Sequence, residues 1–238
     1  MTAVLDERRR KSLSDYQALV DRYPGLFAQR VHRRLVLDRA ELVAFMDEHD
    51  AVLGVAVETP QVYFLMDLVE SRRPDGTPIR YPYLRVVLRG QLDGGFNVVV
   101  VGVIADAALG RIGDIIVLRQ ERHATGTVEL ELPRGFGEAG LPLADNALKE
   151  LQEETGYVGR EARVLGTTLT DSGITDAAVH YVQVPVVARA VPMPDAHEAI
   201  TGVQLMSPAE IWSAVRAGRI RDGFTLQAIA LWEKFGQA

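Results

Sequence analysis

The sequence predicts an α+β fold in which a mixed sheet lies between helices as an α/β/α sandwich, preceded by an extension of helix plus β-hairpin. Three observations predict it. Residues 1–50 have a helical pattern and are followed by two strand-like runs joined by a turn. Residues 96–190 contain further strand-like runs around one helical segment. The C-terminal part carries the start signal of a helix. Strands with helices inserted between them form a sheet that helices cover.

The N-terminal elements follow from local signals. Asp38, with Glu41 three residues later, is typical of a helix start. The runs VYFLMDLVESRR and IRYPYLRVVLRGQL predict two strands, and Pro74-Asp75-Gly76 predicts the turn between them. Because Gly94-Gly95 follows, we predict an N-terminal domain over residues 1–95 and a second domain over residues 96–238.

The second domain shows strand periodicity at several places. FNVVVVGVIAD, DIIVLRQER, RVLGTTLT and VHYVQVPVVA are typical of strands. In TVELELP, apolar Val128, Leu130 and Leu132 alternate with two glutamates, which predicts a half-buried strand. LADNALKELQEET is helical. Ser207-Pro208-Ala209-Glu210 is a capping box with proline at the first helical position, and a last helix is expected over residues 225–235.

Composition narrows the functional classes. The chain has 238 residues, 47% hydrophobic and 24% charged, a net charge of −6 and no cysteine. Thiolate metal sites, disulfides and cysteine nucleophiles are therefore excluded. The negative charge argues against broad nucleic-acid binding. The first residues lack the apolar core of a secretory signal, and no apolar run is long enough to cross a membrane. We expect a cytoplasmic protein without a nucleic-acid or membrane partner.

Three glutamates dominate the chemistry of the helical segment 143–155. Glu150, Glu153 and Glu154 occupy positions i, i+3 and i+4 and so share one face, where like charges repel. Gly156 marks the helix end, so these acids also lie at the negative end of the helix dipole. Ala147 and Leu151 belong to an apolar stripe that the glutamates border. A divalent cation, Mg²⁺ or Mn²⁺, would turn this repulsion into coordination.

The loop before this helix, ELPRGFGEAGLP, also contains the pattern Gly-x-Gly-x-x-Gly. A dinucleotide site would have its helix start around the third glycine, but Pro142 indicates a later start. The ribose-binding acid expected about 20 residues on would fall on the helix itself. The glycines are better explained by a backbone that approaches a ligand closely.

Together, the segment from Gly135 to Tyr157 resembles the 23-residue signature of the Nudix hydrolase family, in which a glycine precedes the sequence Arg-Glu-aliphatic-any-Glu-Glu-any-Gly. The matching residues, all in register without a gap, are Gly135, Glu150, Leu151, Glu153, Glu154 and Gly156. Leu141 replaces the first glutamate of the signature, and Lys149 replaces its arginine. Lysine keeps the charge but lacks the planar fork. Glu138 is a candidate for part of the missing role.

The flanking residues resemble the ADP-ribose pyrophosphatase-like branch of this family. Gln120-Glu121-Arg122 matches its Gln-any-Arg, and residues 131–135 match its Glu-Leu-Pro-Ala-Gly, with Arg134 in place of alanine. The resemblance covers residues 96–238. It implies hydrolysis of a nucleoside diphosphate linked to another group, with that small molecule as partner. It also implies that the N-terminal extension completes the pocket or builds a homodimer.

The same resemblance implies roles for individual residues. Glu150 and Glu154 would bind the metal directly, with the backbone carbonyl of Arg134, and Glu153 would bind a second metal or orient a water. The expected substrate-binding residues are Arg122, Arg134 and Gly135, and for the two arginines a structural salt bridge is the alternative. For the general base, Glu198 is the first candidate and Asp176 the second. An alternative is a Nudix-fold domain with weakened catalysis that binds or senses a nucleotide sugar, which Leu141 and Lys149 favour.

Overall fold

The structure, a computed structural model, describes residues 2–138, 140–194 and 198–236. It divides into two compact units. The first comprises Met1–Leu92 with Asp171–Asp176, and the second comprises Asp93–Thr170 with Ala177–Ala238. Within the described ranges, no helix has both the length and the apolar character that a membrane crossing requires.

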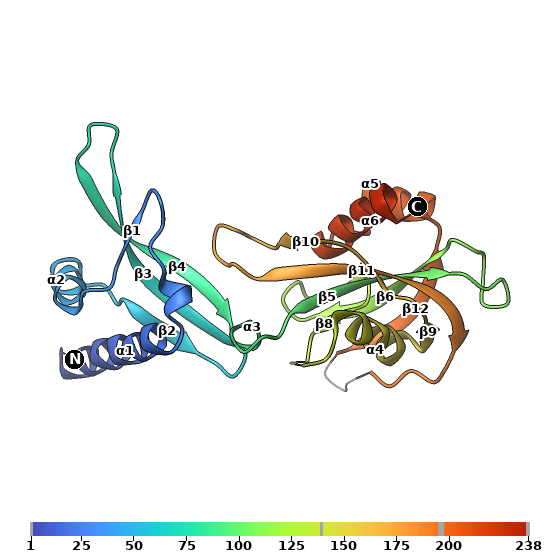
Figure 1. Ribbon diagram of the computed structural model, residues 1–238, viewed down its shortest axis with the longest axis horizontal. Coiled ribbons are helices and arrows are strands. Elements are labelled where there is room, and N and C mark those ends of the chain that lie inside the picture. Colours follow the sequence, from blue (N-terminus) through green and yellow to red (C-terminus); the bar gives the residue numbers. More distant parts are fainter. Residues whose placement is uncertain (1, 139, 195–197, 237–238) are drawn as a thin grey trace. The chain divides into compact units, whose positions relative to one another are not determined.

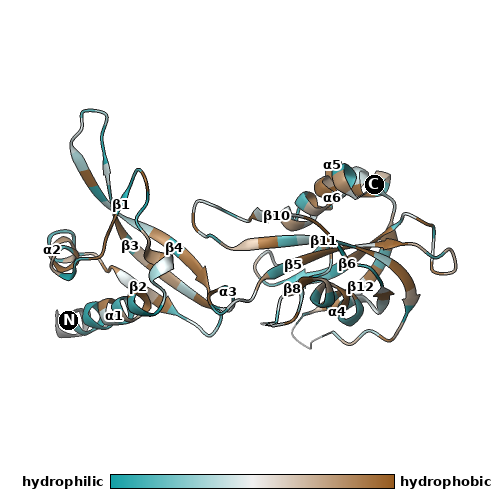
Figure 2. Ribbon diagram, in the orientation of Figure 1, coloured by the Kyte–Doolittle hydropathy of each residue, from teal (hydrophilic) through white to brown (hydrophobic). Residues whose placement is uncertain are grey.

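Two helices and a short 3₁₀ turn precede most of the first unit's strands: α1 (Thr2–Arg22), η1 (Pro24–Phe27) and α2 (Arg39–His49). Asp38 caps α2 as predicted, since its side chain accepts a hydrogen bond from Glu41 N at 2.9 Å. Figure 2 shows α1 mostly hydrophilic and α6 (Gly223–Phe235), in the second unit, mostly hydrophobic. The expectation that residues 1–50 are helical throughout is wrong, because β1 (Arg34–Val36) pairs with a later strand.

An antiparallel sheet forms the rest of the first unit. Its strands are β1, β2 (Gly54–Glu58), β3 (Val62–Arg72) and β4 (Pro78–Leu88), and α3 (Arg89–Leu92) follows. β3 and β4 form the predicted hairpin. At its turn, Asp75 accepts a hydrogen bond from Thr77 N, and Gly76 adopts φ 85°. The predicted extension of helix plus β-hairpin is therefore present.

The second unit is built on an eight-stranded mixed sheet with the central order β10–β11–β5–β6–β12. β7 pairs with β6, β8 with β5 and β9 with β11, and β5–β11 is the parallel pair. The strands are β5 (Asn97–Ile104), β6 (Ile115–Arg122), β7 (Thr127–Glu131), β8 (Arg134–Phe136), β9 (Tyr157–Gly159), β10 (Arg163–Leu169), β11 (Ala178–Arg189) and β12 (Ile200–Met206).

Helices cover both faces of this sheet, which confirms the predicted sandwich. α4 (Leu143–Thr155) lies on one face, and α5 (Pro208–Arg216) and α6 lie on the other (Figure 1). Alternate residues of β5 supply the two cores: Val98 and Val100 pack with α4, whereas Val99 and Val101 pack with α5 and α6. The capping box of Ser207 and Glu210 starts α5 as predicted.

β7 buries its two glutamates as well as part of its apolar face, on which Leu130 packs against the core that contains Leu132, as alternation predicts. Glu129 and Glu131 are 5% and 1% exposed, whereas Val128 is 45% exposed. The physical reason is pairing, since Arg221 binds Glu129 and Arg122 binds Glu131, each with an N–O distance of 2.6 Å. Buried carboxylates are tolerated when they are paired and hydrogen-bonded.

Candidate active site

α4 brings two of the three signature glutamates to the edge of the core. The helix packs Ala147 and Leu151 against the sheet, and Glu150 and Glu154 lie on the same buried side, 9% and 3% exposed. The helix ends where Gly156 adopts φ 72° and donates its N–H to Gln152 O at 2.8 Å. A side chain at that φ would be strained. The predicted helix, its end and the position of its acids along the core are confirmed.

Gly135 on β8 lies directly against the carboxylate of Glu150. β8 pairs with β5, with Gly135 opposite Val98. A Cβ atom at residue 135 would be closer than 3.0 Å to the carboxylate of Glu150. Real side chains do not approach so closely, so glycine is what allows the strand to contact this glutamate.

Gly135→Ala is expected to displace the Glu150 carboxylate and lower Mn²⁺ affinity by about tenfold or more, since metal sites depend on fixed ligand orientation. Isothermal titration with Mn²⁺ measures this effect. Gly90→Ala is the matched control, because a Cβ atom there meets no atom within 4 Å. Equal Mn²⁺ affinities in the two variants would show that the close contact between Gly135 and the Glu150 carboxylate does not orient a metal ligand.

The electrostatic environment of Glu150 and Glu154 is unfavourable to their negative charges. Burial, followed by the neighbouring charge of Glu153, raises the pKa of Glu150 to about 7. Burial, followed by the charges of Glu198 and Glu150, raises the pKa of Glu154 to about 8. In the described part of the chain, neither carboxylate forms a salt bridge. The charges of Lys149 and Arg122 lower these two pKa values only in part, so burial still dominates for both acids.

The peptide of Arg134 faces these acids. Arg134 N donates a hydrogen bond to Glu154 Oε2 at 3.0 Å. The hydrogen bonds of this segment to the β5 side come from the odd-numbered residues on either side of Arg134. Pro133 O accepts from Val100 N, and Gly137 N donates to Phe96 O. Because antiparallel strands alternate the direction of their peptide groups, the carbonyl of Arg134 turns away from β5 with its N–H. It therefore faces the edge on which Glu154 lies.

The side chains of the two predicted substrate-binding arginines converge on Glu131. Arg122 donates to both carboxylate oxygens of Glu131, at 2.9 and 2.6 Å. Arg134 donates to Glu131 Oε2 from Nε at 3.1 Å and from Nη2 at 3.0 Å. Burial disfavours the Glu131 charge, but the Arg122 hydrogen bonds and the Arg134 charge outweigh it and lower the pKa of Glu131. A structural ion pair is thus what these arginines form here.

Lys149, which replaces the signature arginine, pairs with an acid of the preceding loop. Its Nζ donates a hydrogen bond to Glu138 Oε1 and lies 3.6 Å from Glu153 Oε2. Leu141 stands where the signature has its first glutamate, and Glu138, three positions earlier, supplies the acid that pairs with Lys149. Glu153 is only half-buried and sits at the outer side of the cluster.

The two candidate bases differ in their placement. Glu198 is partly buried, and its charge raises the pKa values of both Glu154 and Glu150, which places it beside the cluster. Gln120 Nε2 donates to Glu198 O at 2.5 Å. The preceding residues 195–197, including His197, lie outside the described residues. Asp176 is exposed and belongs to the segment grouped with the first unit, whereas the glutamates belong to the second.

A hard divalent cation fits the donors that this unit gathers. Glu150 and Glu154 are buried carboxylates that form no salt bridge with the residues that the structure describes, and the Arg134 carbonyl turns toward the same edge. Oxygen donors of this kind suit Mg²⁺ or Mn²⁺. In the residues that the structure describes, no three acidic or histidine side chains already form a complete ligand set. Water and substrate oxygens would therefore complete the coordination, as is usual for Mg²⁺.

The sequence did not predict one buried polar residue near the glutamates of α4. Asn146, one turn before Glu150 on α4, is fully buried, and neither polar atom of its side-chain amide has a hydrogen-bond partner among the described residues. Its position i−4 from Glu150 was the available signal, since such residues share a helix face.

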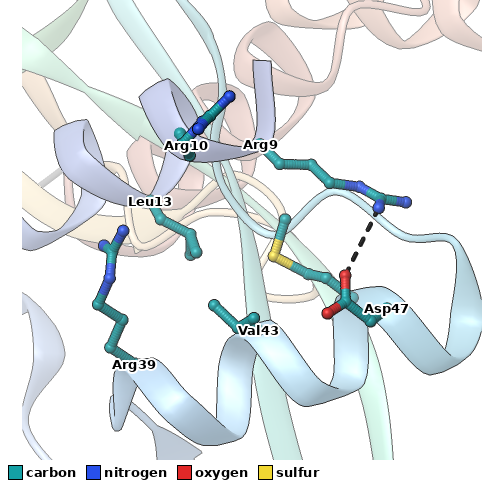
Figure 3. Close-up of a pocket in the computed structure, with 7 residues that line it drawn as sticks. Arg9, Arg10, Leu13, Arg39, Val43 and Asp47 are labelled. Carbon is teal, nitrogen blue, oxygen red and sulfur yellow. Dashed lines mark ion pairs between the residues drawn. The ribbon is translucent and has the colours of Figure 1, made fainter. Parts of the chain in front are cut away.

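A separate cavity lies in the first unit, between α1 and α2 (Figure 3). It measures about 230 Å³, and arginines and aliphatic side chains line it. Arg9 in its wall lies 3.7 Å from Asp47. With one carboxylate among three arginines, Arg9, Arg10 and Arg39, this cavity lacks the acidic donors of a metal site.

Comparison with known proteins identifies the fold family. A Mus musculus ADP-sugar pyrophosphatase is 38% identical over 72 residues, 30% of this chain and 33% of that protein. ADP-ribose pyrophosphatases of Bacillus subtilis and Saccharomyces cerevisiae are 34% and 35% identical over 79 and 77 residues, 33% and 32% of this chain. These matches span 43% and 33% of the two relatives, so less than half of each curated relative is covered.

A solved structure shows the same fold at low identity. The crystal structure of an ADP compounds hydrolase superposes with a TM-score of 0.60 and 16% identity, covering 77% of this chain and 92% of that one. The sequence profile described as NUDIX domain matches residues 96–226, more than half of the chain. The resemblance that the signature residues suggest is thereby confirmed, and the chain belongs to the NUDIX domain family.

Proposed function

We propose that this protein is a metal-dependent hydrolase that cleaves the pyrophosphate bond of ADP-ribose or a related nucleotide sugar. The observation that carries the proposal is the pair of buried, only partly compensated carboxylates of Glu150 and Glu154 beside the Arg134 peptide. The names of the relatives, ADP-sugar and ADP-ribose pyrophosphatase, support the substrate class.

In this proposal Glu150, Glu154 and the Arg134 carbonyl bind Mg²⁺ or Mn²⁺. When bound, the cation would supply positive charge that offsets the negative pyrophosphate and makes the attacking water more acidic. Glu153, on the outer side of the cluster, binds a second cation or orients that water. Gly135 lets the β8 backbone approach the ligand.

The remaining steps fall to side chains near Glu154. Glu198 accepts the proton of the attacking water, because its charge lies close enough to raise the pKa of Glu154. Arg122 supplies positive charge for the phosphate oxygens. Its guanidinium pairs with Glu131 and also lies close enough to Glu154 for the charge of that acid to raise the pKa of Arg122, so it is near the proposed metal site. Asp176 stays the second candidate base, and Glu198→Gln compared with Asp176→Asn in a turnover assay distinguishes the two.

A substrate panel tests the proposal. We expect purified protein with Mg²⁺ or Mn²⁺ to convert ADP-ribose or a nucleotide sugar into two monophosphates, detected as phosphate after phosphatase treatment. Chelation by EDTA should abolish the signal. Binding of a nucleotide sugar without turnover, unchanged by Glu154→Gln, would instead support the sensing domain that Leu141 and Lys149 favour.

We further propose that the protein is a cytoplasmic homodimer. The support is the N-terminal extension of helices and β-hairpin, which precedes the family domain. Sedimentation equilibrium measures the assembly state, and a strict monomer at micromolar concentration would contradict the dimer.

A further inference from the structure

Arg134 occupies the position at which the similar Glu-Leu-Pro-Ala-Gly sequences have alanine, and its side chain has a dense set of partners. Nε and Nη2 both donate to Glu131 Oε2. The guanidinium lies 4.4 Å from the centre of the Phe224 ring, a cation–π contact, and 3.9 Å from Asp222 Oδ1. Glu131 ends β7, whereas Asp222 and Phe224 start α6.

The same corner of the chain has a second tie to α6. Leu132 N donates to Thr225 Oγ1 at 3.0 Å, and Thr225 N donates to the capping carboxylate of Asp222 at 2.8 Å. Thr225 is buried, so the first turn of α6 is a firm support. The β7–β8 corner is thus fixed to α6 by the hydrogen bond from the Leu132 N–H to the Thr225 hydroxyl and by the Arg134 side chain.

The guanidinium points away from the glutamates of α4. Successive side chains of a strand project to opposite faces. The side-chain direction of Gly135 meets the Glu150 carboxylate, so the Arg134 side chain projects to the other face of β8, where Glu131 and Phe224 lie. Its peptide group, in contrast, lies at the strand edge and donates to Glu154. Side chain and peptide therefore have different partners.

We propose that Arg134 is a positioning residue: its side chain, anchored by Glu131 and Phe224, fixes the orientation of its own peptide so that the carbonyl and the Glu154 carboxylate present their oxygens to the metal together. This inference rests on the proposed function. It differs from the expected role of Arg134 in substrate binding, because the fork of the guanidinium is engaged on the far face of β8.

The experiment uses the full chain and Mn²⁺ as probe, with free Mn²⁺ measured by electron paramagnetic resonance. Arg134→Ala should weaken Mn²⁺ binding by about tenfold, in the range typical for residues that orient metal ligands. KM for ADP-ribose at saturating Mn²⁺ should stay within about twofold, because positioning of a metal ligand is not a substrate contact. Arg134→Lys, which keeps the charge but loses the fork and the stacking, should recover only part of the affinity.

Arg221→Ala is the matched control. Arg221 pairs with buried Glu129 on the same strand β7, and its hydrogen bonds within the described residues go to Glu129 and Thr127, so its loss should leave Mn²⁺ affinity unchanged. Should Arg134→Ala fold poorly, Phe224→Leu removes the ring contact, keeps the Glu131 pair, and should weaken Mn²⁺ binding by a smaller factor.

Two results would overturn the inference in different ways. In the first, wild-type protein binds Mn²⁺ and Glu154→Gln does not, but Arg134→Ala binds Mn²⁺ as tightly as wild type and its KM for ADP-ribose rises tenfold. Arg134 then contacts the substrate, and the inference alone fails. If wild-type protein binds Mn²⁺ no better than Glu154→Gln, the inference falls together with the proposed function.

Discussion

Glu154→Gln is expected to lower the turnover of ADP-ribose or a nucleotide sugar by about 10³-fold at millimolar Mn²⁺, equivalent to about 4 kcal/mol of transition-state stabilisation. Gln keeps the size of the side chain and an oxygen that accepts from Arg134 N, so the helix and its contacts with β8 stay intact. It removes the negative charge that binds the cation, and the charge of the pyrophosphate then goes unbalanced. The measurement is single-substrate turnover at several Mn²⁺ concentrations.

The matched control for this prediction is Asp145→Asn on the same helix. Asp145 is exposed in the first turn of α4, outside the glutamate cluster. Its amide variant removes the same unit of charge, and activity should stay within about twofold, since the helix-dipole effect of one exposed acid is small. Glu150→Gln should behave like Glu154→Gln. Wild-type activity in either variant would refute the assignment of these two carboxylates to the metal.

The acids of α4 were predictable because every signal for them is local. Helical periodicity fixes which residues share a face, and Gly156 marks the end of the helix, so the sequence alone placed Glu150 and Glu154 beside the core. β8 and β9 were not predicted. Each has only three residues, and strands this short carry too few alternations to be recognised.

The burial of the two glutamates of β7 was not predictable by the same reasoning. Alternation shows that two faces differ, but it assigns the apolar face to the core by default. Here Glu129 is buried because Arg221, 92 positions later, pairs with it. The anchoring of Arg134 likewise depends on Phe224, which is distant in sequence. Such contacts between residues far apart in sequence form only when the chain has folded. The sequence could therefore identify Arg134 as a candidate residue but not predict its partner Phe224.

The candidate site also predicts a conflict between stability and function in metal-free protein. The pKa of Glu154 is raised from its ordinary 4.5 to about 8 in the folded state, with burial as the main cause. The folded state therefore retains this proton over a pH range in which the unfolded chain releases it. Stability falls as pH rises from about 4.5 to about 8, and the full loss applies above that range.

Glu154→Gln should consequently be more stable than wild type in the presence of EDTA, by about 2 to 4 kcal/mol at pH 8.5, since each unit of pKa shift corresponds to about 1.4 kcal/mol. At pH 4.5 or below the two proteins should unfold at nearly the same urea concentration. Glu150, whose pKa is about 7, titrates in both proteins, so the difference between them reports on Glu154 together with its repulsion from Glu150. Saturating Mn²⁺ should reverse the order at pH 8.5, because a ligand that binds only the folded wild type stabilises it by mass action. Parallel stability curves from pH 4.5 to 8.5 would show that the Glu154 charge is already compensated without metal. The Glu154 carboxylate would then destabilise the metal-free protein and stabilise the metal-bound one. Cation binding would explain why this charge is buried at the end of α4.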